Sequence, residues 1–177
     1  VFLSEEAFGG PRIADDVWWS EPFLVTSDGA VPESIAPKCL DDGSVRLSGQ
    51  GMGWRLTPNL QLTREDQYDP SELLQDNCKP ALDQYYTNGP TGWLCTTGCN
   101  LAHLPDGRTV ATYLHHEDPF RAAGKYRLLV ERDGRFEAVG LCPSEDMEAA
   151  MLGGEPILLE RNGSSLSVRY LSTSAPR

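Results

Sequence analysis

The sequence predicts an all-β, or mainly β, fold built from repeated antiparallel hairpins, with one or two short helices. Two observations predict it. Asp-Gly or Asn-Gly pairs recur along the chain, and tight hairpin turns favour these pairs because both central residues take a positive φ. When the last two pairs are placed at turns, apolar residues meet apolar residues across the strands. A length of 177 residues fits one domain, which we place over residues 1–177. The pairs are Asp28-Gly29, Asp42-Gly43, Asp106-Gly107, Asp133-Gly134 and Asn162-Gly163.

The last two hairpins predict a definite strand register. A turn at Asp133-Gly134 places Leu128 opposite Val139 and Tyr126 opposite Leu141. A turn at Asn162-Gly163 places Leu159 opposite Leu166 and Ile157 opposite Val168. One buried sheet face requires such apolar pairs.

The hairpins also repeat at a regular interval. The turn glycines at 107, 134 and 163 are 27 and 29 residues apart, and the segments 127–134 and 157–163 are similar in sequence. Such spacing indicates a meander, a barrel-like sheet or a propeller-like array whose blades have two or three strands.

The remaining elements follow from local signals. Strands are expected near 22–26, 44–48, 52–57, 92–97 and 108–115, and residues 27–44 are expected to form a loop. A capping-box variant at Asp69 predicts a helix that Pro80 ends or kinks. A second helix is expected from Ser144 to about Leu152, with acidic residues in its first turn and Gly153 closing it.

The charge of the chain restricts its partners. A net charge of −11 argues against nucleic acid, whose phosphates it would repel, and disfavours anionic lipid. It favours encounter with a basic protein, such as a basic secreted enzyme, or simply serves solubility. No apolar run approaches the ~20 residues of a transmembrane helix, so we expect no transmembrane segment. Phosphate-loop, dinucleotide and catalytic fingerprints are missing from the sequence, and we expect no cofactor and no metal.

The five cysteines indicate an oxidising compartment. They stand at 39, 78, 95, 99 and 142, and allow at most two bridges within the chain. Our disulfide predictions are Cys95 with Cys99 and Cys39 with Cys78, although spacing does not fix the connectivity. The sequence starts at Val1, so we expect a removed signal peptide and a periplasmic or secreted location, with a lost lipid anchor as an open alternative.

One cluster of residues offers three interpretations. Two thiols and two imidazoles suit tetrahedral zinc, and a thiol with an imidazole and a carboxylate suits a cysteine hydrolase. The spacing C-x3-C fits a zinc knuckle poorly, and no helix start marks either cysteine as a nucleophile. We therefore favour a disulfide with surface histidines. The cluster comprises Cys95, Cys99, His103, His115, His116, Glu117 and Asp118.

Aromatic residues in turn-rich sequence are candidates for partner binding. Neighbouring residues of an extended chain point to opposite faces, so one of Trp18 and Trp19 is expected in the core while the other is available to a partner. A tryptophan doublet also suits stacking on sugar rings. The candidate partner-binding residues are Trp18, Trp19, Tyr85, Tyr86, His115, His116, Glu117, Asp118 and Phe120.

The hairpins at Asp106-Gly107, Asp133-Gly134 and Asn162-Gly163 resemble the organisation of periplasmic immunity proteins that block type VI secretion peptidoglycan amidases. The resemblance covers about the C-terminal half of the chain and involves no diagnostic motif. It implies a small secreted β protein whose loop plugs the amidase cleft and covers its catalytic Cys and His. The loop 115–124 is our candidate plug, with Tyr85-Tyr86 and Gly89-Pro90 as a second.

Together these features favour a binding or inhibitor protein that acts through loops on a β scaffold, and we assign no catalytic residue. The alternatives are a hydrolase centred on the Cys/His cluster and a carbohydrate or cell-envelope binding module that uses the tryptophans.

Overall fold

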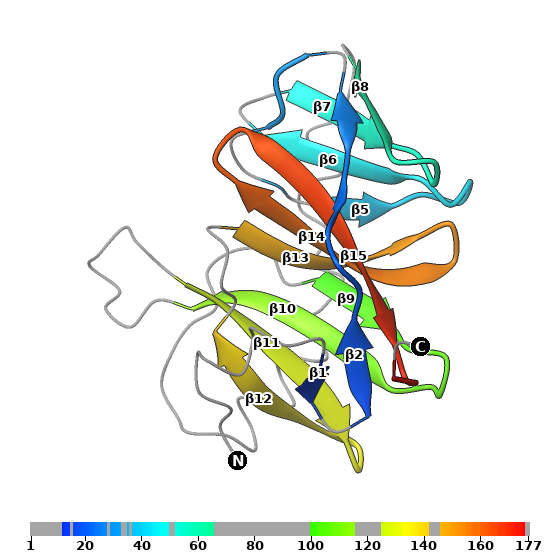
Figure 1. Ribbon diagram of the computed structural model, residues 1–177, viewed down its shortest axis with the longest axis vertical. Coiled ribbons are helices and arrows are strands. Elements are labelled where there is room, and N and C mark those ends of the chain that lie inside the picture. Colours follow the sequence, from blue (N-terminus) through cyan, green and yellow to red (C-terminus); the bar gives the residue numbers. More distant parts are fainter. Residues whose placement is uncertain are drawn as a thin grey trace.

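Every regular element that the structure describes is a β-strand (Figure 1). The computed structural model describes residues 12–14, 16–27, 29–32, 35, 37–49, 52–65, 100–115, 125–141 and 146–175. Within these ranges the strands form three sheets, and none of the three closes into a barrel. No helix in this part of the chain is long and apolar enough to cross a membrane. The predicted all-β class is confirmed.

The middle sheet joins the N-terminal and C-terminal parts of the described chain. Its order is β1-β2-β15-β14-β13, and β3 also pairs with β15. Ser20 and Tyr170, which are 150 residues apart, exchange two hydrogen bonds of 2.9 Å at this junction. The strands are β1 (Arg12–Ala14), β2 (Val17–Trp19), β3 (Phe23–Leu24), β13 (Asp146–Leu152), β14 (Glu155–Asn162) and β15 (Ser165–Ser172).

Each of the two outer sheets is mainly a meander. One has the order β12-β11-β10-β9 and comprises β9 (Asn100–His103), β10 (Thr109–His115), β11 (Lys125–Arg132) and β12 (Arg135–Leu141). The other has the order β4-β8-β7-β6-β5 and comprises β4 (Thr26–Ser27), β5 (Pro37–Cys39), β6 (Val45–Gly49), β7 (Met52–Leu56) and β8 (Gln61–Glu65). All pairs of described strands are antiparallel except β4 with β8.

The middle sheet is buried on both faces, so the described part of the molecule has three β layers and two hydrophobic clusters (Figure 1). Successive side chains of a strand point to opposite faces. Leu158 accordingly packs in the cluster shared with the β9–β12 sheet, while Ile157 and Leu159 pack in the cluster shared with the β4–β8 sheet. These three side chains are completely buried.

Four of the five predicted turns lie in hairpins, although three of them are built differently from the prediction. Asp133 and Gly134 both take a positive φ between β11 and β12, as a type I′ turn requires. At Gly43 and Gly107 only the glycine has a positive φ, because each closes a three-residue turn. Asp28 of the fifth pair lies outside the described residues, and the preceding strand β4 pairs in parallel with β8.

The predicted registers hold only in part. From the turn outward, β11 and β12 pair as predicted as far as Leu129 opposite Ala138, where an irregularity shifts the pairing and sets Leu128 opposite Gly140. In β14–β15 the turn is one residue later, because Asn162 pairs with Ser165 and only Gly163 takes a positive φ. Leu159 therefore faces Val168, and Ile157 faces Tyr170. The predicted register was wrong there, although the shift keeps every side chain on its predicted face.

The predicted helix from Ser144 to Leu152 is wrong: residues 146–152 form strand β13. Both faces of this strand are buried, so its apolar run lacks the alternation of a half-buried strand and looks helical. Gly153 and Gly154 both take a positive φ and make a hairpin turn rather than a helix cap. The helix predicted after Asp69 and the strand near 92–97 lie outside the described residues. Within the predicted loop 27–44, residues 37–39 form β5.

The edge of β13 that faces away from β14 is covered by the two outer sheets. The Ala149 N–H donates to Thr112 Oγ1 at 2.7 Å, and the Met151 N–H donates to Cys39 Sγ at 3.3 Å. The N–H of Gly153, directly after the strand, donates to the Gly43 carbonyl at 2.7 Å. An open edge is a template for unwanted strand pairing, and these contacts satisfy three donors along it.

Candidate functional site

Most of the predicted partner-binding residues lie outside the described residues. These are Tyr85, Tyr86, His116, Glu117, Asp118 and Phe120. His115 is the last residue of β10, where its backbone pairs with Lys125. The roles of the loop 115–124 and of the tyrosine pair stay predictions.

The two described histidines lie far apart. His103 pairs with Thr109 at the start of β10, and His115 ends the same strand. Six residues of strand separate their positions by about 20 Å, since each residue advances the chain by about 3.3 Å. His103 Nδ1 instead lies 3.3 Å from Thr109 Oγ1. Among the described residues no group of three His, Cys, Asp or Glu side chains is placed to hold a metal.

The predicted disulfides are not tested by the structure. Cys39 is exposed on β5, and its sulfur accepts the Met151 N–H. Cys78, Cys95 and Cys99 lie outside the described residues.

The tryptophan pair divides as the alternation of a strand predicts. Trp19 is 4% exposed and packs in the cluster shared with the β9–β12 sheet, whereas Trp18 is half-buried. The Arg169 guanidinium carbon lies 4.2 Å above the Trp19 ring. The expectation that one of the two lies in the core is confirmed, and Trp18 is the one with surface left for a partner.

Two large apolar side chains stand out at the surface of the described chain, both on β3. Phe23 is 48% exposed and Leu24 is 72% exposed. Neighbouring strand residues point to opposite sides, so the two side chains project on either side of β3. The Phe23 ring is held edge-on against Tyr170, with ring centroids 5.5 Å apart.

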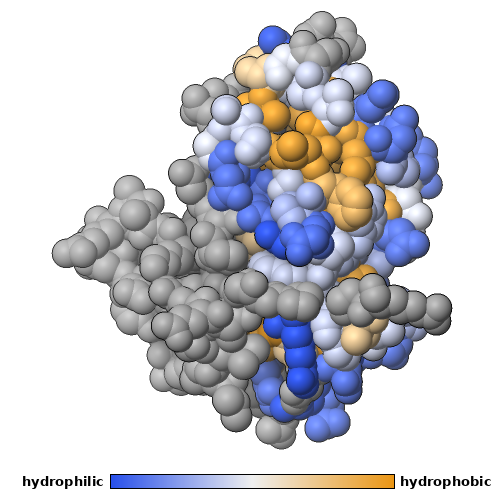
Figure 2. All heavy atoms as spheres, in the orientation of Figure 1, coloured by the Kyte–Doolittle hydropathy of each residue, from blue (hydrophilic) through white to orange (hydrophobic). Residues whose placement is uncertain are grey.

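We call the apolar side chains on and beside β3 the β3 patch: Phe23, Val25, Leu60 and Tyr170 on one side of the strand, and Leu24 on the other. Val25, Leu60 and Tyr170 are partly buried against the same cluster, and the Thr26 N–H donates to the Leu60 carbonyl at 2.9 Å. Figure 2 shows an apolar area on the face that the N-terminal segment crosses, bordered by hydrophilic residues. Exposed apolar patches of this kind, rimmed by polar residues, mark interaction sites.

The β3 patch is shaped for side-chain contacts rather than for strand addition. Phe23 faces Val168, and the Val25 N–H donates to the Leu166 carbonyl at 2.9 Å. Because hydrogen-bonded positions alternate in an antiparallel ladder, the peptide groups of Leu24 point to the outer edge. However, β3 has only two residues and Pro22 before it has no N–H to donate. Short strands and prolines protect an edge against strand addition.

A charge–aromatic network anchors the strands that carry the patch. Arg169 Nε lies 2.7 Å from Glu160 Oε2, and Arg169 Nη1 donates to the Ser20 carbonyl at 3.1 Å. Because the same guanidinium lies over Trp19, it joins β14, β15 and the connection between β2 and β3. The apolar side chains of β3 are thus presented from a fixed position.

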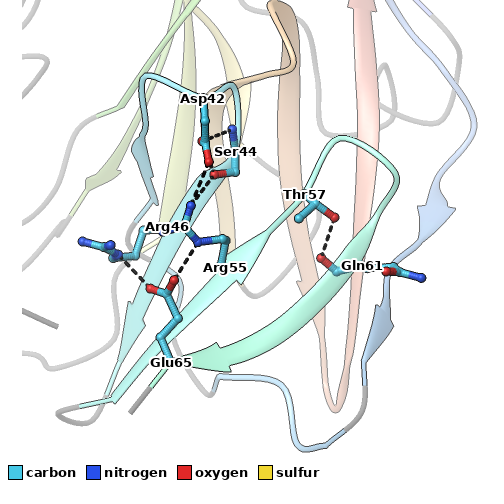
Figure 3. A network of polar contacts seen from close by, with 7 residues as sticks. All are labelled: Asp42, Ser44, Arg46, Arg55, Thr57, Gln61 and Glu65. Carbon is cyan, nitrogen blue, oxygen red and sulfur yellow. Dashed lines mark hydrogen bonds and ion pairs between the residues drawn. The ribbon is translucent and has the colours of Figure 1, made fainter. Parts of the chain in front are cut away.

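A second polar network covers the outer side of the β4–β8 sheet (Figure 3). Arg46 and Arg55 face each other across β6 and β7, and Glu65 lies between them, 3.0 Å from Arg46 Nε and 2.6 Å from Arg55 Nε. Arg55 also bonds to Asp42 at 2.9 Å and to Ser44 at 3.2 Å. Each charged group here has a partner of opposite sign, so we assign the network a structural role in holding the strands together.

The carboxyl pKa values agree with that role. Burial raises the pKa of Glu65, but hydrogen bonding and charge from Arg55, and then from Arg46, outweigh it and leave the pKa below its usual value. Hydrogen bonds from Ser44, followed by the charge of Arg55, lower the pKa of Asp42. Both carboxylates therefore stay charged at neutral pH, and neither is poised as a general acid.

Comparison of the chain with protein-family models, with curated proteins and with solved structures finds no match. The candidate site therefore depends on the geometry of the β3 patch. The sequence predicted a strand near 22–26 but gave no reason to place its side chains at the surface. The available signal was Pro22 directly before a short apolar run, which is typical of an edge strand.

Proposed function

We propose that this chain is an extracytoplasmic protein-binding domain of the inhibitor type, which binds a basic protein through the β3 patch. The observation that carries the proposal is the exposure of Phe23 and Leu24 beside a sheet that is otherwise well packed. Burying an apolar side chain that size is worth roughly 1.5–3 kcal/mol when it starts fully exposed. Phe23, whose ring is held against Tyr170, and Leu24, on the other side of the same strand, would anchor a partner that fits around β3.

The charge of the chain supports a basic partner. The net charge is −11, and Glu21, two residues before Phe23, is exposed and makes no ion pair with the described residues. A negative surface speeds encounter with a positive one and disfavours association between identical copies.

We further propose that the partner is a peptidoglycan amidase and that the chain acts as a periplasmic immunity protein. The supporting feature is the succession of hairpins that resembles such proteins. In this proposal the loop 115–124 covers the amidase cleft, and the β3 patch supplies a separate anchoring contact. The predicted disulfides, Cys95–Cys99 and Cys39–Cys78, fit the same oxidising compartment.

We also interpret the three sheets as an open, propeller-like array. In support, β13 lies against both β5 and β9, the first strands of the two outer meanders, and each meander then leads away along the chain. In this interpretation β2 and β3 complete the third unit by pairing with β15.

The test is binding to purified secreted peptidoglycan amidases with a pI above about 9, measured by calorimetry alongside inhibition of cell-wall hydrolysis. Leu24→Asp should weaken binding at least tenfold, the effect expected of an interface anchor. The added negative charge would itself favour a basic partner, so a loss reports the apolar contact.

The matched control is Thr63→Asp on β8, which adds the same charge at another exposed strand position. It should leave the affinity within about twofold, because a charge away from the contact mainly affects the encounter rate. If none of the amidases binds, or if Leu24→Asp binds as the unmodified chain does, the proposal is wrong.

A further inference from the structure

Three hairpins among the described residues share one turn design, but the third turn residue is glycine in two of them and leucine in the other. In each, the carbonyl of the residue before the turn accepts the N–H of the third turn residue. The N–H of the same residue before the turn donates to the carbonyl of the residue that follows the turn. The two bonds are 3.0 and 2.9 Å at residues 40–44, 3.0 and 2.8 Å at residues 104–108, and 2.9 and 3.0 Å at residues 57–61. The third residue takes a positive φ in all of them: 85° at Gly43, 89° at Gly107 and 63° at Leu60.

Leucine is the wrong residue for that backbone conformation. At positive φ its Cβ lies too close to the following carbonyl oxygen, which costs an L-residue stability, whereas glycine has no Cβ. The other two turns show the solution that this turn design ordinarily takes. Leu60 therefore keeps a strained backbone for the sake of its side chain.

The position of the Leu60 side chain explains why this turn has a leucine in place of glycine. Leu60 is only partly buried, so packing against the cluster is only part of the reason for a leucine at this position. Its carbonyl accepts the Thr26 N–H, which fixes the turn beside the segment that follows Phe23 and Leu24. The strained leucine thus lies in the β3 patch, and the two glycines lie in turns outside it.

We infer that Leu60 is a specificity-determining contact residue of the β3 patch, and that the patch fits an apolar knob surrounded by lysine and arginine on a basic protein. This inference rests on the proposed function and names the chemistry of its partner surface. Glu21 stands two residues before Phe23 and supplies an acidic flank for such a rim. A second copy of the chain, itself at −11, and an anionic lipid surface would both be repelled.

The test separates stability from binding by exchanging residues between equivalent turns. Leu60→Gly removes the backbone strain along with the side chain, and we expect its Tm to stay within about 3 °C of the unmodified chain because the two effects oppose each other. Its affinity for a basic amidase that the unmodified chain binds should fall at least fivefold. Raising the salt from 50 to 300 mM should weaken binding of both proteins by a similar factor, because Leu60→Gly leaves the charges unchanged.

Gly107→Leu is the matched control. Nothing lies within 4 Å of a Cβ placed at Gly107, so this variant reports the backbone cost of a leucine at positive φ. We expect its Tm to fall by roughly 2–6 °C and its affinity to stay within about twofold.

The outcomes are distinct. If the unmodified chain binds no basic amidase, the proposed function and this inference fall together. If it binds and Leu60→Gly binds equally well, or loses far more Tm than Gly107→Leu, Leu60 is a packing residue and only this inference falls. Sedimentation that shows the β3 patch closing a dimer, lost in Leu24→Asp, would also overturn it.

Discussion

Strands β14 and β8 are each the second strand of a hairpin, but they differ in how many of their residues are buried. In β14 every residue from Pro156 to Glu160 is buried, because clusters lie on both faces of the middle sheet. In β8 the buried Leu62 is followed by the exposed Thr63 and Arg64. Burial on both faces removes the exposed positions that mark a strand at the surface, whereas β8 keeps them.

The two regions also differ in where their ion pairs lie. Glu160 and Arg169 are mostly buried, with 7% and 17% of their side chains exposed, and they connect strands of the middle sheet. Arg46, Arg55 and Glu65 form their network on the outer face, where water screens it (Figure 3). A charge pair should therefore matter more for stability in the middle sheet.

The largest expected effect comes from leucine truncation. Leu158→Ala and Leu159→Ala, which point into different clusters, should each cost about 2–5 kcal/mol of unfolding free energy. In β8, Leu62→Ala should cost a similar amount, while Thr63→Ala should cost less than about 1 kcal/mol. Urea unfolding measures all four. A small loss of unfolding free energy at either Leu158 or Leu159 would mean that the corresponding face of the middle sheet is not fully buried.

A smaller effect is expected when the buried charge pair is broken. Glu160→Gln keeps the shape of the side chain but leaves Arg169 without its 2.7 Å carboxylate partner, which should cost about 2–4 kcal/mol. Glu137→Gln is the surface control, because the Arg132–Glu137 pair is 3.6 Å long and about half exposed on both sides. It should cost less than about 0.5 kcal/mol. Equal losses in the two variants would remove the proposed difference between the regions.

The smallest effect concerns the outer network and depends on pH. Glu65→Gln should cost about 1 kcal/mol at neutral pH, because it leaves two facing arginines without their shared carboxylate. The pKa of Glu65 is lower in the folded chain than its usual 4.5, so its contribution is present above pH 4.5 and is lost as the pH falls through the folded value.

The measurement for that prediction is unfolding free energy between pH 7 and pH 3. The gap between Glu65→Gln and the unmodified chain should close toward the acid end. Asp42→Asn, at the exposed end of the same network, is the control and should change stability less at every pH. A gap that stays constant with pH would show that Glu65 acts through packing instead.

The sequence predicted the strands that have one exposed face and the turns that join them. Gly134 with Asp133 marked a type I′ turn, and the strands at 45–49, 52–56 and 109–115 lie where they were expected. The largest failure occurred in the middle sheet, while the irregularity in β11–β12 and strand β5 were missed in the outer sheets. The run Met147–Leu152 was mistaken for a helix, because burial of both faces depends on sheets that no local pattern reveals. The pair Gly153-Gly154 was the missed hairpin signal.

The candidate site was harder to predict than the fold. One of Trp18 and Trp19 was expected in the core and the other at the surface, and alternation explains that division, with Trp19 as the buried residue. The exposure of Leu24 depends on which strands lie beside β3, and the strain at Leu60 depends on its turn geometry. Neither property can be predicted from the residues that are next to these leucines in the sequence. The first follows from the pairing of β3 with β15, more than 100 positions away in the chain, and the second from the turn at residues 57–61 and its contact with Thr26.

The shared middle sheet also has a consequence for how the molecule comes apart. Strands β13, β14 and β15 contribute side chains to both hydrophobic clusters, so neither outer layer can detach without uncovering one side of them. The two halves of the interior are thermodynamically coupled, and heat or denaturant should melt them in one cooperative step. Assembly carries the same constraint, because the middle layer is complete only when segments from opposite ends of the chain have met, a topology that slows folding.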